Sequence, residues 1–396
     1  MDEIKYGLIG EKLGYSYSKL IYDYLGIDYK LIEIDNDHLE SFLKEKNFKG
    51  LNVTIPYKEK VIPYLDEVIG VAKEINVCNT IVNIDGKLIG YNTDYDGFSY
   101  LLNEYGELEN KEILVIGTGA TSKTVKKVLF DKGVKDVKVA SRKEGYDYKT
   151  NNLTKKFDFV INTTPVGTYP NICDKINVES SDVIDVVYNP YRTRLALDNK
   201  FRASGFDMLI VQALKSMELF NIKINKSFDE IKRHLLLKVG NIVLIGMPGS
   251  GKTTLGKLLS RELSMPFVDT DQEIERTESI DDIIGRSVDE FREIEKNVIK
   301  KVSLLHGAVI ATGGGTVENE ENIKVLASNG FIIYIERDVD EIFETFTPHP
   351  LIKTKEELLE VYLRRRDLYL KYSDLVIECN SLEDALNDIL TKLKTR

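Results

Sequence analysis

The sequence predicts an α/β protein with more than one domain. Apolar runs typical of buried strands alternate with helical patterns along the chain, which favours parallel sheets. In two places, 113–122 and 242–254, the strand pattern ends in a glycine-rich turn that opens a helix. The length of 396 residues suggests two or three domains that can each bury a core. We therefore expect helix-covered parallel sheets with sites at these two turns.

Composition and charge exclude several classes of protein. Hydrophobic residues make up 42% and charged residues 30%, as in ordinary globular proteins. A net charge of −10 argues against a general nucleic-acid binder. The three cysteines are far apart and form no ligand or disulfide pattern, which fits a reducing cytoplasm. The N-terminus starts directly with a strand pattern, no stretch approaches transmembrane length, and the four histidines form no His-x-x-x-His pair. We expect a cytoplasmic protein without a membrane or nucleic-acid partner, and not a zinc enzyme.

The strongest motif lies at 242–254, where an apolar strand leads into a complete G-x-x-x-x-G-K-[ST] phosphate loop. Its glycines let backbone N–H groups approach phosphate oxygens. Lys252 offers a charge to the outer phosphates, and the Thr253 hydroxyl is placed for Mg²⁺. Apolar residues at helical spacing follow, so the loop opens a helix, where anions bind well. A chance glycine-rich turn is the alternative. The predicted nucleotide contacts are Gly246, Gly249, Ser250, Gly251, Lys252, Thr253 and Thr254.

The turn at 117–122 resembles the dinucleotide fingerprint G-x-G-x-x-G, with Ser122 in place of the third glycine. A strand pattern precedes this turn and a helical pattern follows it. After the next strand, at 137–140, the chain has Ser141, Arg142 and Lys143 where NAD enzymes usually carry an acidic residue. Two cations there suit a 2′-phosphate and favour NADP over NAD. A solvated charge pair is the alternative.

Residues 52–58 place polar side chains around an extended, proline-stiffened segment that ends in Lys58. A lysine that acts as acid or base needs a tuned pKa, and a nearby carboxylate is the usual partner. Asp94 is a candidate partner, but spacing alone does not show that the two side chains touch.

The order and approximate spacing of several segments resemble the motifs of the shikimate dehydrogenase family: 15–18, 52–58, 78–80, 92–94, 117–120, 162–167 and 205–212. The resemblance covers about residues 1–238. It implies a substrate domain built from about 1–98 and 212–238, with a Rossmann NADP domain at about 99–211 between them.

The resemblance also implies roles for single residues. Ser16 and Ser18 would hold the substrate carboxylate. Lys58, paired with Asp94, would move the hydroxyl proton while hydride passes between the substrate and the nicotinamide. The other implied substrate contacts are Thr54, Asn79, Asp94, Tyr188 and Gln212. The implied NADP contacts are Gly117, Thr118, Gly119, Ala120, Thr121, Ser141, Arg142, Val186 and Gly205.

Two positions depart from the dehydrogenase pattern. Lys19 and Arg194 each replace a proline that is usual in the family. We expect both positions to lie in loops, where they could change substrate affinity.

Residues 239–396 resemble shikimate kinase, which implies a P-loop domain with a parallel sheet like that of the nucleoside-monophosphate kinases. Two carboxylates, Asp269 and Asp271, end a short strand pattern and are expected to face the same cleft. The resemblance places Asp269, with Thr253, on the side of Mg²⁺. It makes Asp271 the ligand and candidate base of the acceptor hydroxyl, with Lys252 as the second catalytic residue.

Further motifs of the same family indicate an acceptor that carries a carboxylate. Arg292 matches its carboxylate-binding arginine, with Glu295 expected to orient it. The glycine triplet at 313–315 would bring backbone N–H groups to the substrate, and Gly314 is the implied contact. Arg365 matches the second substrate arginine, but Arg364 and Arg366 flank it and leave the register open.

The lid segment departs from the family. Shikimate kinases carry an arginine directly before Pro-Leu in this segment, and here His349 occupies that position. Such an arginine can contribute several powers of ten in rate to phosphoryl transfer. Histidine could replace it only when protonated, and its unperturbed pKa is about 6.5.

These motifs together predict a bifunctional enzyme of chorismate and aromatic amino-acid biosynthesis. Residues 1–238 would reduce 3-dehydroshikimate to shikimate with NADPH, and residues 239–396 would phosphorylate shikimate with MgATP. One alternative is a shikimate dehydrogenase with a weak or inactive kinase-like regulatory module, and another is a quinate-type dehydrogenase with a different kinase acceptor. The sequence leaves the oligomeric state open, with a homodimer as one option.

Overall fold

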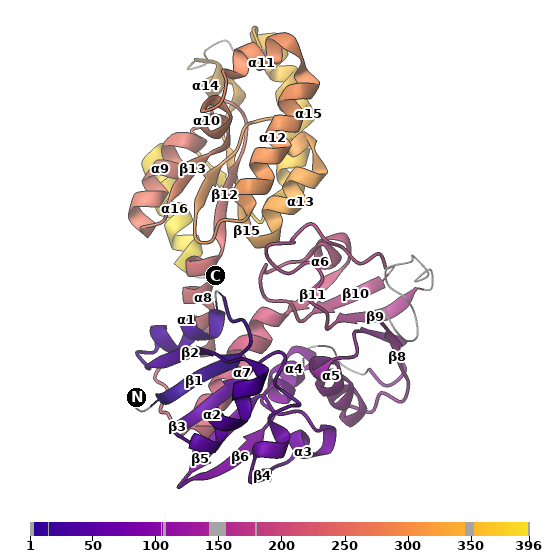
Figure 1. Cartoon of the computed structure of the whole chain (residues 1–396). Coiled ribbons are helices and arrows are strands. Elements are labelled where there is room, and N and C mark those ends of the chain that lie inside the picture. The colour runs from indigo at the N-terminus through magenta and orange to yellow at the C-terminus, as the bar shows by residue number, and fades with distance from the viewer. Residues whose placement is uncertain are drawn as a thin grey trace. The chain divides into compact units, whose positions relative to one another are not determined.

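The computed structural model describes residues 4–14, 16–103, 105, 108–141, 156–178, 180–344 and 352–394. Contacts divide the chain into two compact units, 1–168 with 174–235 and 169–173 with 236–396. The division falls within α8 (Phe228–Val239). Strands and helices alternate in both units (Figure 1), which confirms the predicted α/β class. Within the described ranges, no helix combines the length and apolar character needed to span a membrane.

The first sheet of unit 1 is mixed, with the strand order β2-β1-β3-β5-β6-β4. The pairs β1–β2, β1–β3 and β4–β6 are parallel, whereas β3–β5 and β5–β6 are antiparallel. The strands are β1 (Ile4–Gly10), β2 (Tyr29–Glu33), β3 (Phe48–Val53), β4 (Glu67–Val68), β5 (Thr80–Ile84) and β6 (Lys87–Tyr91).

Helices on this sheet bury its apolar side chains. Side chains of α2 pack with those of β1, β3, β5 and β6 in one core cluster. The helices and 3₁₀ turns of this part are α1 (Tyr17–Tyr24), η1 (Asn36–His38), α2 (Leu39–Glu45), η2 (Ile62–Tyr64), α3 (Val71–Ile75), α4 (Asp94–Leu102) and α7 (Gly205–Leu219).

The stretch 212–237 contains the end of one helix and most of a second. Helix α7 ends at Leu219 and α8 begins at Phe228. Asn221 lies between them with φ of 57°, a left-handed conformation that asparagine tolerates but that a continuing right-handed helix excludes.

The second sheet of unit 1 is parallel throughout, in the order β11-β10-β9-β7-β8. Core side chains of α4 and α5 cover one face, and those around α6 cover the other. The elements are β7 (Ile113–Ile116), α5 (Ala120–Asp131), β8 (Val137–Ala140), β9 (Phe157–Asn162), β10 (Ser180–Asp185), α6 (Arg194–Asp198) and β11 (Phe201–Ser204).

Unit 2 has a parallel sheet in the order β13-β14-β12-β15-β16. Helices α9 and α16 lie on one face, and α12, α13 and α15 lie on the other (Figure 1). The strands are β12 (Asn241–Ile245), β13 (Phe267–Asp269), β14 (Val309–Ala311), β15 (Gly330–Glu336) and β16 (Leu375–Glu378). The helices and 3₁₀ turn are α9 (Lys252–Leu263), α10 (Thr270–Glu275), α11 (Ile280–Arg286), α12 (Val288–Ser303), η3 (Thr316–Glu318), α13 (Glu320–Asn329), α14 (Val339–Glu344), α15 (Lys355–Tyr372) and α16 (Leu382–Lys394).

Candidate functional sites

The fold brings Lys58 and Asp94 into direct contact. Lys58 Nζ lies 2.6 Å from Asp94 Oδ2, and the two side chains are only 13% and 9% exposed. Lys58 follows β3, and Asp94 is the first residue of α4, directly after β6 and a short turn. Strands β3 and β6 belong to one sheet with β5 between them, and the fold therefore creates a contact that the spacing of 36 residues could not establish. A shielded ammonium beside a carboxylate is suited to moving a proton.

Asn79 holds the other oxygen of the Asp94 carboxylate. Its Nδ2 donates to Asp94 Oδ1 at 2.9 Å, and its Oδ1 accepts from the Thr93 backbone N–H at 2.7 Å. Both carboxylate oxygens of Asp94 thus have donors, so removing one partner would leave a buried charge poorly compensated.

Ser216, which the sequence reasoning missed, connects this group to α7. Its Oγ lies 2.8 Å from Asn52 Nδ2 and 3.1 Å from Thr93 Oγ1. The same hydroxyl donates to the carbonyl of Gln212, one helical turn earlier, at 2.9 Å. The only available signal was the i, i+4 spacing from Gln212, which places both side chains on one face of the helix.

The predicted carboxylate-binding serines lie at the start of α1. Ser16 is the N-cap, whose Oγ accepts from the Lys19 backbone N–H at 3.4 Å, and Ser18 lies within the helix. The expectation that Lys19 lies in a loop is therefore wrong. No hydrogen bond among the described residues joins Ser16, Ser18 or the predicted contact Thr54 to the Lys58–Asp94 pair.

Tyr188 links α1 to the region of Asp94. Its ring packs against that of Tyr17, with centroids 5.4 Å apart. Tyr188 retains 38% exposure, and desolvation followed by the charge of Asp94 raises the pKa of its hydroxyl. Gln212 is buried, and its Nε2 donates to the carbonyl of Leu209 at 2.9 Å.

The turn after β7 has the geometry of a dinucleotide-binding loop. Gly117 has φ of 116°, and a Cβ there would lie 2.4 Å from Thr163 Oγ1. Ser122 Oγ donates to the Gly117 carbonyl at 2.7 Å, so the serine closes the turn in place of the third glycine. Gly119 is the N-cap of α5 and has open space at its Cβ position. The predicted contacts Thr118, Ala120 and Thr121 flank this N-cap. The backbone N–H groups at the uncapped start of the helix fit a pyrophosphate.

The other predicted NADP contacts follow neighbouring strands of the same sheet. Ser141 directly follows β8 and is buried, whereas Arg142 lies outside the described residues. Val186 follows β10, and a Cβ on Gly205 would lie 1.8 Å from the Val186 carbonyl oxygen. Only glycine permits this approach. The residues therefore gather at the carboxyl edge of the parallel sheet, where ligands of such folds bind.

Arg194 also departs from its expected place. It is the first residue of α6 and is buried, and Thr193 caps this helix. Proline is favoured at the first position of a helix, which accounts for the family's usual residue there. The expectation of a loop at Arg194 is wrong.

The phosphate loop at the end of β12 is shaped by left-handed glycines, with φ of 80° at Gly249 and 91° at Gly251. Lys252 Nζ donates to the backbone carbonyls of Gly246 at 2.9 Å and Met247 at 2.7 Å. Burial lowers the pKa of Lys252 to about 8. In the described structure, the buried Ser250 Oγ has no hydrogen-bond partner. Because the N-cap Gly251 has no side chain, the first turn of α9 is also uncapped, and both features fit a bound phosphate chain.

Thr253 and Asp269 form the predicted metal side of the loop. Thr253 Oγ1 donates to Asp269 Oδ2 at 2.6 Å, and Asp269 Oδ1 caps α10. Hydroxyl and carboxylate oxygens are the ligand types that Mg²⁺ takes. Asp271 lies in the first turn of α10 rather than on the strand end, which corrects its expected position. Desolvation, followed by the charge of Asp269, raises the pKa of Asp271 to about 6.

A cavity of about 450 Å³ opens beside the loop. Residues 249–254, which include Thr254, line one side, and Arg337 and residues 379–382 line another. Arg337 NH1 also donates to the Gly249 carbonyl at 3.2 Å. The sequence reasoning missed Arg337 and 379–382. Their position directly after β15 and β16, at the same carboxyl edge of the sheet as the loop, was the feature that could have identified them.

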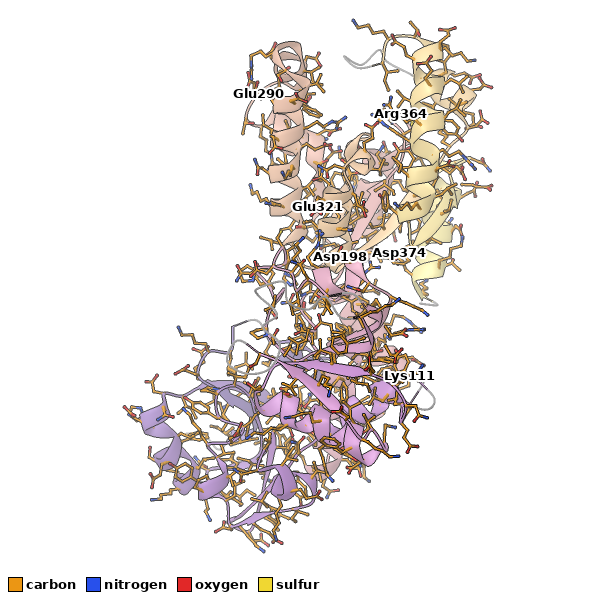
Figure 2. All side chains as sticks on the ribbon, turned by 90° about the vertical axis from the view of Figure 1, so that its right-hand side faces the viewer. Lys111, Asp198, Glu290, Glu321, Arg364 and Asp374 are labelled. Carbon is orange, nitrogen blue, oxygen red and sulfur yellow. The ribbon has the colours of Figure 1, made fainter. Side chains whose placement is uncertain are left out.

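Arg292 and Arg365, the two predicted acceptor-binding arginines, both lie beside Glu318 in unit 2. Arg292 NH1 is 2.8 Å from Glu295 Oε2, and the buried Glu295 accepts from Thr316 Oγ1 at 2.9 Å. Glu295 therefore orients Arg292, as expected. Arg365 is 6% exposed at its side chain, whereas Arg364, which Figure 2 labels on α15, is 61% exposed. Arg365 is thus the buried member of the arginine run.

The glycine triplet permits close approach of three site residues. A Cβ would lie 2.6 Å from Asp271 Oδ1 at Gly313, 2.5 Å from Pro248 Cδ at Gly314 and 2.5 Å from Arg292 NH2 at Gly315. The Gly313 N–H already donates to Thr270 Oγ1 at 3.0 Å. The Gly313 N–H thus has a partner within the protein, and Gly314 stays the predicted substrate contact of the triplet. His349 and its neighbours 345–351 lie outside the described residues.

Three family models match the chain. The model for the shikimate dehydrogenase substrate binding domain matches residues 8–81, and that for shikimate / quinate 5-dehydrogenase matches 101–181. The model for shikimate kinase matches 248–394. Together they match parts of both units, including Lys58, the turn at 117–122 and most of the phosphate loop, whereas Asp94, Tyr188 and Gln212 lie outside the matched ranges.

Curated relatives match the dehydrogenase part over nearly their whole length. Shikimate dehydrogenases (NADP(+)) of Clostridium beijerinckii and Methanosphaera stadtmanae are 38% and 34% identical, over 54% and 58% of this chain and 91% and 95% of theirs. Shikimate dehydrogenase 1 from Peptoclostridium difficile and a chorismate mutase/shikimate 5-dehydrogenase fusion protein from Clostridium acetobutylicum are similar solved structures. Each is 33% identical with a TM-score of 0.52, over 58% and 59% of this chain and 97% and 98% of theirs. The chain therefore belongs to the shikimate dehydrogenase family and carries a shikimate kinase domain in its C-terminal part.

Proposed function

We propose that this protein catalyses two consecutive steps of chorismate and aromatic amino-acid biosynthesis. Its dehydrogenase part, 1–238, reduces 3-dehydroshikimate to shikimate with NADPH. Its kinase part, 239–396, transfers a phosphoryl group from MgATP to the 3-hydroxyl of shikimate. The observation that carries the proposal is that a Lys–Asp proton-transfer pair and a phosphate loop beside two arginines occur in one chain. The product of the first site is then the acceptor of the second.

In the dehydrogenase site, Lys58 supplies the proton. NADPH supplies the hydride to the carbonyl carbon when bound at the turn 117–121. As negative charge develops on the carbonyl oxygen, the Lys58 ammonium donates a proton to it, and the ion pair with Asp94 holds the ammonium in position. Ser16 and Ser18 hold the substrate carboxylate, and the hydroxyl contacts are Thr54, Asn79, Tyr188 and Gln212.

In the kinase site, Asp271 accepts the proton of the acceptor hydroxyl. MgATP supplies the γ-phosphoryl group when bound at the phosphate loop. The acceptor oxygen bonds to the γ-phosphorus while the bond to the bridging oxygen breaks and ADP leaves. Lys252 stabilises the charge on the phosphates, and Thr253 and Asp269 hold the metal. Arg292, Arg365 and Gly314 hold the acceptor.

The decisive experiment incubates the purified protein with 3-dehydroshikimate, NADPH, ATP and Mg²⁺, and follows the products by chromatography. We expect shikimate 3-phosphate, and shikimate alone when ATP is omitted. Accumulation of shikimate without its phosphate in the complete mixture would contradict the bifunctional proposal.

His349 favours a second candidate, in which the kinase part is a weak or inactive regulatory module. Shikimate-dependent ADP release measured in a coupled assay distinguishes the two. Robust release rejects the regulatory candidate. Under the bifunctional proposal, His349→Arg preserves or raises turnover, because a permanently charged side chain replaces one that is charged only at low pH.

Substrate and cofactor preference complete the proposal. We infer a cytoplasmic enzyme that acts on small molecules, without nucleic-acid or membrane partners, and prefers NADP over NAD. A comparison of kcat/KM for shikimate and quinate, each with NADP and NAD, tests it. A preference for quinate would favour a quinate-type dehydrogenase with a different kinase acceptor.

A further inference from the structure

We infer that Glu318 occupies the two arginines of the kinase acceptor site and competes with the carboxylate of the incoming acceptor. The inference rests on the proposed function, which makes Arg292 and Arg365 the ligands of that carboxylate. Glu318 would thereby determine how tightly the kinase part binds shikimate.

One carboxylate contacts three guanidinium groups. Glu318 Oε2 lies 2.8 Å from Arg365 NH2 and 3.5 Å from Arg292 NH2. Its other oxygen, Oε1, accepts from Arg364 Nε at 2.9 Å. The arginines come from α12 and α15, so Glu318 joins two helices at the point where both present positive charge.

The backbone holds Glu318 in this position. It ends η3, the 3₁₀ turn that follows the glycine triplet, and its N–H donates to the Gly315 carbonyl at 3.0 Å. The approach of Arg292 to Gly315 brings the guanidinium beside this turn. Although partial burial opposes the effect, the hydrogen bond from Arg365 and the charges of all three arginines lower the pKa of Glu318. The competitor is therefore an anion at neutral pH.

Glu318 differs from Glu295, the other carboxylate at Arg292. Glu295 is 1% exposed and has a second partner in Thr316, so it serves as a fixed support. Glu318 is 27% exposed at its side chain and can exchange its ion pairs for water. An acceptor carboxylate that binds Arg292 and Arg365 meets charges that are already compensated. Its binding is weakened by the loss of the Glu318 pairs or by repulsion from Glu318.

Replacing the anion by its neutral isostere tests this competition. For Glu318→Gln in the full-length protein, we expect the KM for shikimate in ADP release to fall on the order of tenfold. The kcat should stay unchanged, because the effect lies in binding shared by ground state and transition state. Glu336→Gln is the matched control, because Glu336 pairs with Arg366, the next residue on α15, at 2.9 Å. We expect no change in KM for the control.

An unchanged or raised KM in Glu318→Gln would overturn the inference and make Glu318 a structural or orienting partner of the arginines. Calorimetric titration with shikimate gives the same test without turnover. The full-length protein has two proposed shikimate sites, and binding to the kinase site is identified as the binding event that is lost in Arg365→Ala. Tighter binding at that site in Glu318→Gln supports the inference, and equal or weaker binding rejects it. If neither the unmodified protein nor Glu318→Gln binds shikimate at the kinase site, the proposed acceptor is wrong and the inference is rejected together with it.

Discussion

The two lysines that we propose to be catalytic, Lys58 and Lys252, have different surroundings. Lys58 contacts a carboxylate at 2.6 Å. Among the described residues, Lys252 Nζ donates to two neutral backbone carbonyls, and burial, partly offset by the charges of Asp271 and Asp269, lowers its pKa to about 8. A lysine that donates a proton needs a permanent partner that holds it in the charged form. A lysine that binds phosphates can obtain its counter-ion from the ligand. Burial of the lysine without that counter-ion raises the free energy of the empty site, and binding of the phosphates lowers it again.

The largest effect is expected from removing the phosphate-binding lysine. Lys252→Ala should lower ADP release by roughly 10³-fold or more, because a charge aimed at the transferring phosphoryl group is lost. Dehydrogenase activity of the same preparation, measured by NADPH absorbance, should remain. Lys257→Ala, an exposed position on the same helix, is the control. Retained ADP release in Lys252→Ala would show that the loop does not serve transfer.

Removing the paired lysine should affect only the other activity. Lys58→Ala should lower NADP-dependent oxidation of shikimate on the order of 10²–10³-fold, within the range of general acid–base catalysis. Lys60→Ala, whose Nζ contacts Asn36 at an exposed site, should retain full rate. Kinase activity should be unaffected. A loss smaller than tenfold would mean that another group moves the proton.

The pH dependence of nucleotide affinity separates the two lysines further. Because the pKa of Lys252 is lowered to about 8, the free site carries an ammonium below pH 8 and a neutral amine above it. ATP affinity should be constant below pH 8 and then fall by up to about tenfold per pH unit. Calorimetry in buffers of different ionisation enthalpy should show proton uptake on binding at pH 9. Affinity independent of pH between 7 and 9.5 would contradict a lowered pKa.

The raised pKa of Asp271 predicts how the kcat of the kinase part depends on pH below neutrality. This pKa is about 6, so Asp271 accepts a proton from the acceptor hydroxyl only above that pH. The kcat of the kinase should fall as pH decreases through about 6, and Asp271→Asn should remove the activity together with this pH dependence. A kcat profile that stays flat down to pH 5 would exclude Asp271 as the base.

The smallest effect is expected at the support of the dehydrogenase site. Ser216→Ala should destabilise the protein by about 1–2 kcal/mol, because buried partners of the hydroxyl lose a hydrogen bond. Denaturant unfolding measures this change. A lower kcat/KM for shikimate should accompany it, because Gln212 and Thr93 lose their shared contact. The exposed Ser41→Ala is the control. Unchanged stability would show that water replaces the hydroxyl.

The site residues form two groups: those within one continuous motif, and those whose partners lie far away in the sequence. Sequence patterns were sufficient for the two glycine-rich turns, since each is a continuous strand–turn–helix unit. They were insufficient for Ser216, Arg337 and Glu318, whose partners lie on distant segments. The expected loops at Lys19 and Arg194 were wrong because the start of a helix depends on single capping residues that patterns resolve poorly.

The α/β class, the phosphate loop and the resemblance to the two families could be predicted from the sequence alone, because they depend on consecutive residues and their order. The contact between Lys58 and Asp94, the burial of Arg365 rather than Arg364, and the position of Glu318 beside Arg292 and Arg365 became known only from the folded structure. These are contacts between segments that the sheets and helices bring together, and their energies depend on burial and distance. A sequence pattern contains no information on burial or on the distance between distant segments, because both arise when the chain folds.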